Sequence, residues 1–375
     1  MMNSKKRKII FSVGGGKGGV GKSIFSVSLG TALAKDGYRT VLADLDLGAA
    51  NLHTYLGIVS ETPTIADFIL KKTASLEELL METSVRGLNL ISGAEFVPGM
   101  ANPAHWMKLK IMRHVKSLPA DYVILDLGAG VHFNTLDFFG VSDRGIVITA
   151  PEPGAVMNAY GFIKAALFRK LQNIFRRHSA IGPIIDAETQ KKEAEKILTL
   201  DWLTEKIRGT APDMLPLMDE VRQSFTPVLV VNRIPAEQKN VLVKNLIDLC
   251  SNKLGVHLHH LGNLPEAQTI SNYLLDIPAF LESEAGSLYC ETVEKIKNRL
   301  VNQYKIDRRN REVKSDFTDG EISEIIALME GLDNSIFRDS TRDTWKLRMY
   351  FKPAAVVQYL IGRGVSHDAF YESSS

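Results

Sequence analysis

The feature that most constrains the fold is a glycine-rich stretch near the start of the chain, GGGKGGVGKS at residues 14–23. It follows the apolar run 9–13 and precedes a segment with helical spacing, so we expect it to join a strand to a helix. Glycines let backbone N–H groups approach a polyphosphate closely, and the helix N-terminus adds partial positive charge. The phosphate-loop pattern G-x-x-x-x-G-K-[ST] is satisfied by Gly16, Gly21, Lys22 and Ser23.

The side chains of this loop have separate expected tasks. Lys22 is expected to reach the β- and γ-phosphates of a nucleotide, and the Ser23 hydroxyl to bind Mg²⁺. The alternative is a glycine-rich turn before a helix with a merely solvated lysine, which the complete pattern in a strand-to-helix context disfavours. The expected nucleotide contacts are Gly16, Lys17, Gly18, Gly19, Val20, Gly21, Lys22, Ser23 and Ile24.

An additional lysine follows the first glycine of the pattern, giving KGGVGKS from Lys17 to Ser23. This wording resembles the deviant Walker-A loop of the MinD/ParA family of P-loop ATPases. The resemblance implies that Lys17 crosses a dimer interface to the nucleotide of the partner subunit, where it supplies the charge that other enzymes take from an arginine finger. The alternative is a solvated loop lysine.

Composition restricts the class of protein. The chain has 375 residues, 45% of them hydrophobic and 23% charged, with a formal net charge of +2. These values suit a globular protein, and the charge alone does not argue for nucleic acid. Cys250 and Cys290 lie far apart, which disfavours a disulfide scaffold or a CxxC metal site. The basic start lacks the apolar core of a signal peptide, and we expect a cytoplasmic protein without a membrane span.

Short apolar runs alternate with helical stretches along the chain. This pattern predicts an α/β fold, a doubly wound and mostly parallel sheet whose ligands lie beyond the carboxyl ends of the strands. A helix is expected over residues 24–34, ended by Gly37. The predicted strands are 9–13, 40–43, 88–92, 122–125, 145–149, 227–231 and 256–261.

Two segments exceed a minimal version of this fold. We expect an ATPase domain over residues 1–305 with a helical insertion at about 171–224, and a C-terminal extension over 306–375. In the extension, residues 318–321 resemble a capping box and residues 345–351 alternate as in a strand. Two amphipathic helices are predicted in the insertion, one carrying Leu200, Leu203 and Ile207, the other Met214, Met218, Val221 and Phe225.

Three carboxylates follow predicted strands. The family resemblance places Asp44 mainly on the magnesium side of the site and Asp46 mainly on the side of the attacking water; the alternative is that both cap the next turn. Asp126 ends an apolar run and is the expected Walker-B acid that holds Mg²⁺ through water. The expected metal residues are therefore Ser23, Asp44 and Asp126, and the expected catalytic residues are Lys17, Lys22 and Asp46.

Within the family, the wording DYVILDLGAG at residues 121–130 resembles the FlhG branch of flagellar-number regulators. The resemblance extends over about residues 8–300, apart from the insertion, although the N-terminal activator motif typical of that branch is absent. It also implies adenine contacts, for which the alternative is polar strand ends. Those contacts are Asn232, Arg233, Pro265 and Glu266.

The resemblance implies an ATP- and Mg²⁺-dependent dimerisation switch that positions or counts cellular structures, of the flagellum or division-site type. Such an ATPase is slow alone, forms a homodimer with ATP and is stimulated by a partner protein. One alternative is a ParA-type DNA-partition ATPase, for which the basic residues 5–8 and 176–177 are candidates. A less favoured alternative is an iron–sulfur or metal-insertion ATPase.

Relatives in this family attach to the membrane through a C-terminal amphipathic helix, which would make the protein peripheral at the inner face of the membrane. Residues 345–361 are the candidate here. Their strand-like alternation and Pro353 favour a small folded element over such an anchor.

Overall fold

The computed structural model describes residues 8–313 except 48, 60–62, 94–104, 177, 192–198 and 236–240. The capping box and the alternating segment expected in the C-terminal extension lie outside the described residues. The chain divides into two compact units, Met1–Arg169 with Thr226–Asn302, and Lys170–Phe225 with Gln303–Ser375.

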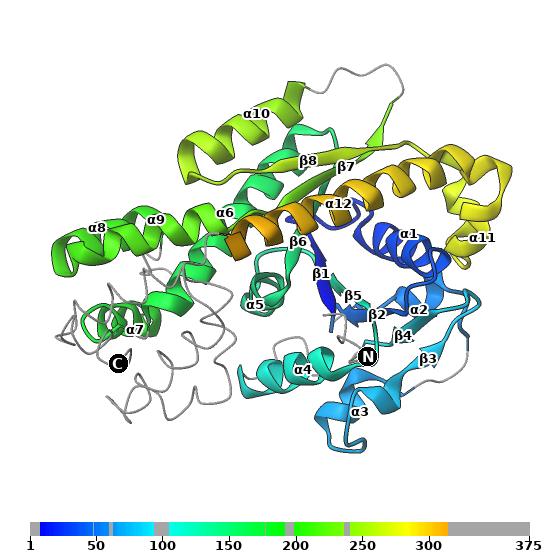
Figure 1. The fold of residues 1–375 in the computed structure, drawn as a ribbon, viewed down its shortest axis with the longest axis horizontal. Helices are drawn as coiled ribbons and strands as arrows, with labels where there is room; N and C mark the ends of the chain where they lie inside the picture. Colours follow the sequence, from blue (N-terminus) through cyan, green and yellow to red (C-terminus); the bar gives the residue numbers. More distant parts are fainter. Residues whose placement is uncertain are drawn as a thin grey trace, which may run out of the picture. The chain divides into compact units, whose positions relative to one another are not determined.

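The first unit is built on an eight-stranded sheet in the order β3-β4-β2-β5-β1-β6-β7-β8 (Figure 1). Neighbouring strands are parallel except β3, which runs antiparallel to β4. This arrangement confirms the predicted mostly parallel sheet. The strands are β1 (Ile9–Gly14), β2 (Thr40–Leu45), β3 (Met81–Glu82), β4 (Leu88–Ile91), β5 (Tyr122–Leu127), β6 (Arg144–Thr149), β7 (Val228–Ile234) and β8 (His259–Pro265).

Helices cover both faces of this sheet, as expected for a doubly wound fold. On one face, α1, α11 and the first part of α12 pack into a continuous apolar core with the strands. On the other face, Phe139 of α5 and Phe162 of α6 pack edge to face with ring centroids 4.9 Å apart. The helices are α1 (Lys22–Lys35), α2 (Leu52–Tyr55), α3 (Ile65–Ile69), α4 (His105–Ser117), α5 (Phe133–Val141), α6 (Pro153–Phe175), α10 (Val241–Leu249), α11 (Ile277–Glu282) and α12 (Ser287–Val313).

Most element boundaries agree with the sequence, and one strand does not. Helix α1 ends just before Gly37, which adopts the left-handed conformation predicted for a helix stop (φ 85°). The last strand was expected at 256–261 but begins at His259. A π-helical turn at Cys250–Leu254 ends in left-handed Gly255, so the apolar Val256 is buried in a connection and the strand starts later. The two-residue strand β3 was not predicted.

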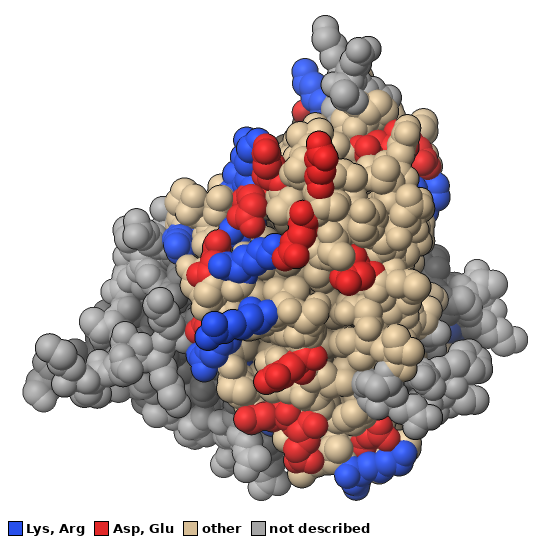
Figure 2. All heavy atoms as spheres, turned by 90° about the vertical axis from the view of Figure 1, so that its right-hand side faces the viewer, with Lys and Arg blue, Asp and Glu red and all other residues tan. Residues whose placement is uncertain are grey.

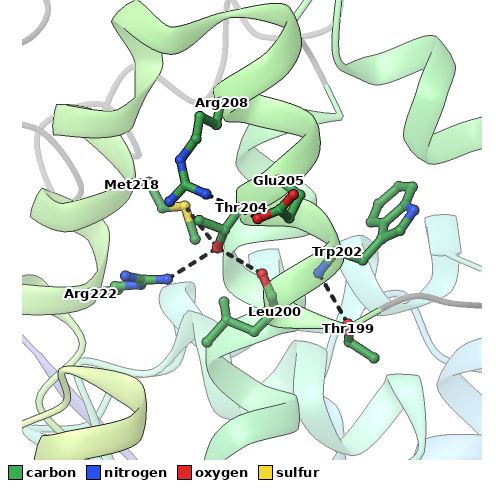
Figure 3. A network of polar contacts seen from close by, with 8 residues as sticks. All are labelled: Thr199, Leu200, Trp202, Thr204, Glu205, Arg208, Met218 and Arg222. Carbon is green, nitrogen blue, oxygen red and sulfur yellow. Dashed lines mark hydrogen bonds and ion pairs between the residues drawn. The ribbon is translucent and has the colours of Figure 1, made fainter.

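The second unit contains α7 (Gly182–Gln190), α8 (Leu200–Thr210) and α9 (Leu215–Ser224), in the segment where we expect a helical insertion. The predicted apolar stripes are buried, including Leu203 and Ile207 on α8 and Met218 and Val221 on α9. The Thr204 hydroxyl of α8 accepts a hydrogen bond from Arg222 of α9 at 3.3 Å, which joins the two helices (Figure 3).

A buried ion-pair network ties α4, α5 and α6 together. The Asp137 carboxylate accepts hydrogen bonds from Lys108 at 2.5 Å and from Nε of Arg169 at 2.7 Å. All three side chains are 10–12% exposed. Burial raises the pKa of Asp137, but the hydrogen bonds and charges of Arg169 and Lys108 outweigh that effect and hold the pKa below its ordinary value.

We predict that Asp137→Ala lowers the free energy of unfolding by about 3–5 kcal/mol at pH 7, because two buried cations lose their counter-charge. Since the folded-state pKa is depressed, this contribution is present above the unfolded-state pKa and is lost as the pH falls through the folded-state pKa. Urea titrations across the acid range measure the effect. Glu291→Ala, which removes an exposed pair with Lys295, is the control and should change stability far less. Equal losses for the two variants would contradict the assignment.

Candidate nucleotide-binding site

The glycine loop runs from the carboxyl end of β1 to the start of α1, and its conformation requires glycine. Gly19 and Gly21 have positive φ angles of 74° and 93°. A Cβ atom at Gly16 would lie 2.0 Å from the carbonyl oxygen of Asn158 in α6, and one at Gly21 would lie 2.2 Å from Nδ2 of Asn232. The loop therefore passes too close to its neighbours for any larger residue at these positions.

Two long-range hydrogen bonds fix the path of this loop. Asn232, which is 6% exposed on β7, donates its side-chain amide to the carbonyl oxygen of Val20 at 2.9 Å. The backbone N–H of Gly130, after β5, donates to the carbonyl oxygen of Gly15 at 3.2 Å. Asn232, which is predicted to contact adenine, thus also holds the loop in place through its side chain.

Lys22 lies at the first turn of α1 with only 8% of its surface exposed. Burial lowers the pKa of its ammonium group, and the charges of Asp126 and Asp46 raise it in part. The structure thus brings together Lys22, Asp46 and Asp126, which the sequence placed in three separate motifs.

Asp44 and Asp126 stand side by side at the ends of neighbouring strands. They are Cα partners in the parallel register of β2 and β5, and each is 1% exposed. Burial raises the pKa of Asp44 to about 8, with a further contribution from the charge of Asp126. Burial likewise raises the pKa of Asp126 to about 6, although hydrogen bonds from Ser23 and Ser26 oppose this. The site therefore holds carboxylates that resist ionisation.

The two carboxylates have different hydrogen-bond donors. Asp44 accepts three backbone N–H groups, from Asp46 at 3.1 Å, Asn51 at 2.9 Å and Leu52 at 3.0 Å. A carboxylate has about four acceptor positions, so Asp44 retains about one for a ligand. Its contacts are those of the turn-capping alternative. Asp126 accepts hydroxyl groups and has more capacity left for a metal or its water.

Asp46 belongs to the loop that Asp44 caps, and its side chain lies against the turn after β5. A Cβ atom at Gly128 would lie 2.9 Å from Oδ1 of Asp46, so the glycine makes room for this carboxylate. Asp46 is partly exposed, unlike Asp44 and Asp126. A partly exposed carboxylate beside Lys22 suits a group that orients a water molecule.

Lys17 is exposed and pairs within its own chain. Its ammonium group lies 2.9 Å from Oε2 of Glu152, which follows β6, with side-chain exposures of 45% and 55%. The hydrogen bond from Lys17 holds the pKa of Glu152 below its ordinary value. Sequence reasoning assigned no role to Glu152, because only the fold brings the ends of β1 and β6 together.

The remaining predicted nucleotide residues gather at the carboxyl ends of β7 and β8. Arg233 is exposed and has a positive φ of 58°. Pro265 ends β8, and the N–H of Glu266 donates to the carbonyl oxygen of Ile234 at 3.2 Å. With Asn232, they lie at the carboxyl ends of two neighbouring parallel strands.

The donor set fits magnesium bound together with a nucleotide. In the described part of the chain, no group of three or more His, Cys, Asp or Glu side chains could hold a metal by itself. Mg²⁺ typically takes one or two carboxylates and completes its shell with phosphates and water. The hydroxyl of Ser23 and the carboxylate of Asp126 offer the oxygen ligands that this ion prefers.

This fold and site define a nucleotide-binding P-loop protein, and comparison with known proteins identifies its family. The chain belongs to the family described as CobQ/CobB/MinD/ParA nucleotide binding domain, whose model matches residues 11–277. The predicted MinD/ParA membership is therefore confirmed.

Two curated relatives support the predicted closeness to the flagellar branch. The chain is 33% identical over 175 residues to the flagellum site-determining protein YlxH of Helicobacter pylori, covering 44% of this chain and 58% of that protein. It is 31% identical over 163 residues to the antiactivator FleN of Pseudomonas aeruginosa, covering 41% and 55%. The chain thus matches little more than half the length of these relatives.

Solved structures share the fold. The septum site-determining protein MinD of Pyrococcus horikoshii, complexed with Mg-ADP, aligns with a TM-score of 0.52 and 17% identity, over 78% of this chain and 96% of that one. A ParA family ATPase from Chlorobium tepidum gives a TM-score of 0.52 and 15% identity, over 79% and 99%.

We predict that the buried pair Asp44 and Asp126 contributes less to stability as the pH rises from about 4 to about 8. The raised pKa values mean that these two groups bind more protons in the folded state than in the unfolded state in this window, so their contribution to the free energy of unfolding falls with pH. Asp126→Asn keeps an acceptor for Ser26 and removes one buried charge. At pH 8 it should raise the free energy of unfolding by on the order of 2 kcal/mol. Chemical denaturation of the parent and the variant at several pH values measures both effects, and a difference between them that does not grow with pH would contradict the prediction.

Proposed function

We propose that this chain is an ATP-binding and ATP-hydrolysing dimerisation switch that uses Mg²⁺. The observation that carries the proposal is the convergence of Lys22, Asp46 and Asp126 beneath a glycine loop. A buried lysine, two carboxylates and the N–H groups of the loop provide the charges and donors that a complex of a metal with a polyphosphate needs. Phosphoryl transfer needs positioning and charge stabilisation more than covalent chemistry.

The side chains divide these tasks. Lys22 and the loop N–H groups hold the β- and γ-phosphates, and Asp46 orients the attacking water and accepts its hydrogen bond. Ser23, Asp126 and the remaining acceptor position of Asp44 hold Mg²⁺, directly or through water. When bound, Mg²⁺ neutralises phosphate charge during transfer. Asn232, Arg233, Pro265 and Glu266 form the base-binding edge.

The slow reaction that we propose for the single chain follows from the position of Lys17. In this structure its ammonium group is held by Glu152 of the same chain. In an ATP-bound homodimer, Lys17 reaches the nucleotide of the partner subunit and adds the positive charge that the monomer lacks. An activating partner protein would raise the rate further by stabilising that arrangement.

The relatives suggest the cellular role. The proteins similar to this chain include a flagellum site-determining protein, an antiactivator and septum site-determining proteins. We propose that this protein likewise positions or counts a cellular structure, from the cytoplasm or from the inner face of the membrane. No helix in the described part of the chain is long and apolar enough to cross a bilayer. The candidate anchor at 345–361 lies outside that part.

The DNA-partition alternative gains little support from charge. On the face that bears α11 and β3, Lys and Arg alternate with Asp and Glu, and the described residues form no continuous basic area there (Figure 2). Of the basic candidates, Lys8 donates to the carbonyl oxygens of Val115 and Lys116, and Arg176 pairs with Asp186. The metal-insertion alternative needs reactive thiols, and burial raises the pKa of Cys250 to about 12.

We predict that Lys22→Ala weakens ATP binding at least about 100-fold, because the phosphates lose their charge-assisted contact in a buried site. Lys35→Ala, at the other end of the same helix, is the matched control and should leave binding unchanged. Calorimetry with ATP and with ADP measures both. Unchanged affinity in Lys22→Ala would falsify the proposed site.

We predict that Asp46→Ala keeps ATP binding, slows hydrolysis and accumulates a dimer, because the water loses its orienting carboxylate.

Lys17→Ala should bind ATP as a monomer and fail to dimerise. Light scattering after size exclusion, with ATP and with ADP, measures these states, and a mixture of the two variants tests whether Lys17 acts across the interface. A parent protein whose mass does not change with ATP removes the basis for both expectations.

A further inference from the structure

Helix α1 contains two buried serines whose hydroxyl groups are used differently. The Ser28 hydroxyl donates to the carbonyl oxygen of Ile24 at 2.7 Å, the local bond that serines commonly make inside helices. The Ser26 hydroxyl instead donates to Oδ1 of Asp126 on β5, also at 2.7 Å and 100 residues away in sequence. Both serines are fully buried. Ser26 thus makes no such local bond and instead binds the carboxylate that is the candidate metal ligand.

We infer that Ser26 is a positioning residue of the nucleotide site, whose hydroxyl group holds the Asp126 carboxylate in place for the magnesium ion. This inference rests on the proposed function. No motif of the sequence pointed to Ser26, which lies three positions beyond the phosphate-loop pattern, inside the helix.

The surroundings of Asp126 explain why it needs such a donor. The carboxylate is 1% exposed and adjoins a second buried carboxylate, Asp44, so burial and repulsion both act against its charge. A hydroxyl donor stabilises the charged form and restricts rotation of the carboxylate plane. Without it, the group would gain freedom and lose a charge-assisted hydrogen bond in a nearly dry site.

Ser26 differs from the other groups around Asp126 because it has a single task. Lys22 and Ser23 must also contact the phosphates and the metal when a nucleotide binds. Among the described residues, the Ser26 hydroxyl makes its hydrogen bond to Asp126, and the side chain is fully buried. Its hydrogen bond can therefore persist in both the free and the bound states.

The test compares the full chain with Ser26→Ala, Ser26→Thr and the control Ser28→Ala. The Ser28 variant removes an equally buried hydroxyl from the same helix, but none that contacts Asp126. A fluorescent ADP analogue is bound in the presence of EDTA and then at increasing Mg²⁺ concentrations. Thermal melting establishes that each variant is folded.

We expect Ser26→Ala to raise the Mg²⁺ concentration for half-maximal tightening of ADP about tenfold, in the range found for residues that support metal ligands. Its ADP affinity in EDTA should equal that of the parent. Ser28→Ala should leave the Mg²⁺ dependence unchanged, and Ser26→Thr should restore it. If Ser26→Ala is unstable, Ser26→Cys keeps the shape with a weaker donor and should lie between alanine and the parent.

Three results would overturn the inference. An unchanged Mg²⁺ dependence in Ser26→Ala would show that the hydroxyl does not serve the metal. An equal shift in Ser28→Ala would assign the effect to helix packing. A parent protein that binds ADP with no Mg²⁺ dependence would overturn the proposed magnesium site together with this inference, whereas the first two results leave the proposed function intact.

Discussion

Two carboxylates buried side by side impose the constraint on which the rest of the site depends. Asp44 and Asp126 are paired in register at the ends of β2 and β5, almost without access to water. Such groups need fixed donors. Asp44 obtains them from the backbone of the following loop, which fixes the position of Asp46, and Asp126 obtains one from Ser26 in α1. These two acidic side chains therefore link the loop after β2 to helix α1. The bond from Ser26 also fixes the rotation of α1, and with it the position of Lys22 in the first turn.

The buried carboxylates lower the stability of the protein and favour the binding of a cation. Burial favours protonated carboxylates, and the raised pKa values of Asp44 and Asp126 express the cost of ionising them. A bound cation and a polyphosphate would replace the missing counter-charges and hydrogen-bond partners, so binding returns stability to the folded state. A site that is less stable when empty responds strongly to its ligand, which suits a protein whose state follows the nucleotide. Elsewhere in the fold, Asp137 has two cations beside it and needs no ligand.

Sequence predicted the local parts of this structure and missed the pairings between distant residues. The glycine loop, the end of α1 before Gly37 and the apolar stripes of the insertion follow from patterns within one segment. The contacts of Ser26 with Asp126 and of Lys17 with Glu152 join residues more than ninety positions apart, and nothing in either segment marks the partner. The late start of β8 has a local cause, because a π-helical turn leaves no periodic signal in apolar residues.

The pairing of Lys17 with Glu152 bears on how the proposed dimerisation would be controlled. An exposed ion pair is only slightly more stable than the same two side chains when they are separated and hydrated, and salt weakens it further. In the proposed dimer, transfer of Lys17 from Glu152 to a phosphate of the partner subunit would therefore face only a small opposing interaction. The favourable contribution would be larger, because a lysine enclosed at an interface next to a triphosphate interacts with several negative charges in a low dielectric. In the proposed dimer, the pair with Glu152 would thus oppose the transfer of Lys17 to the partner subunit only weakly.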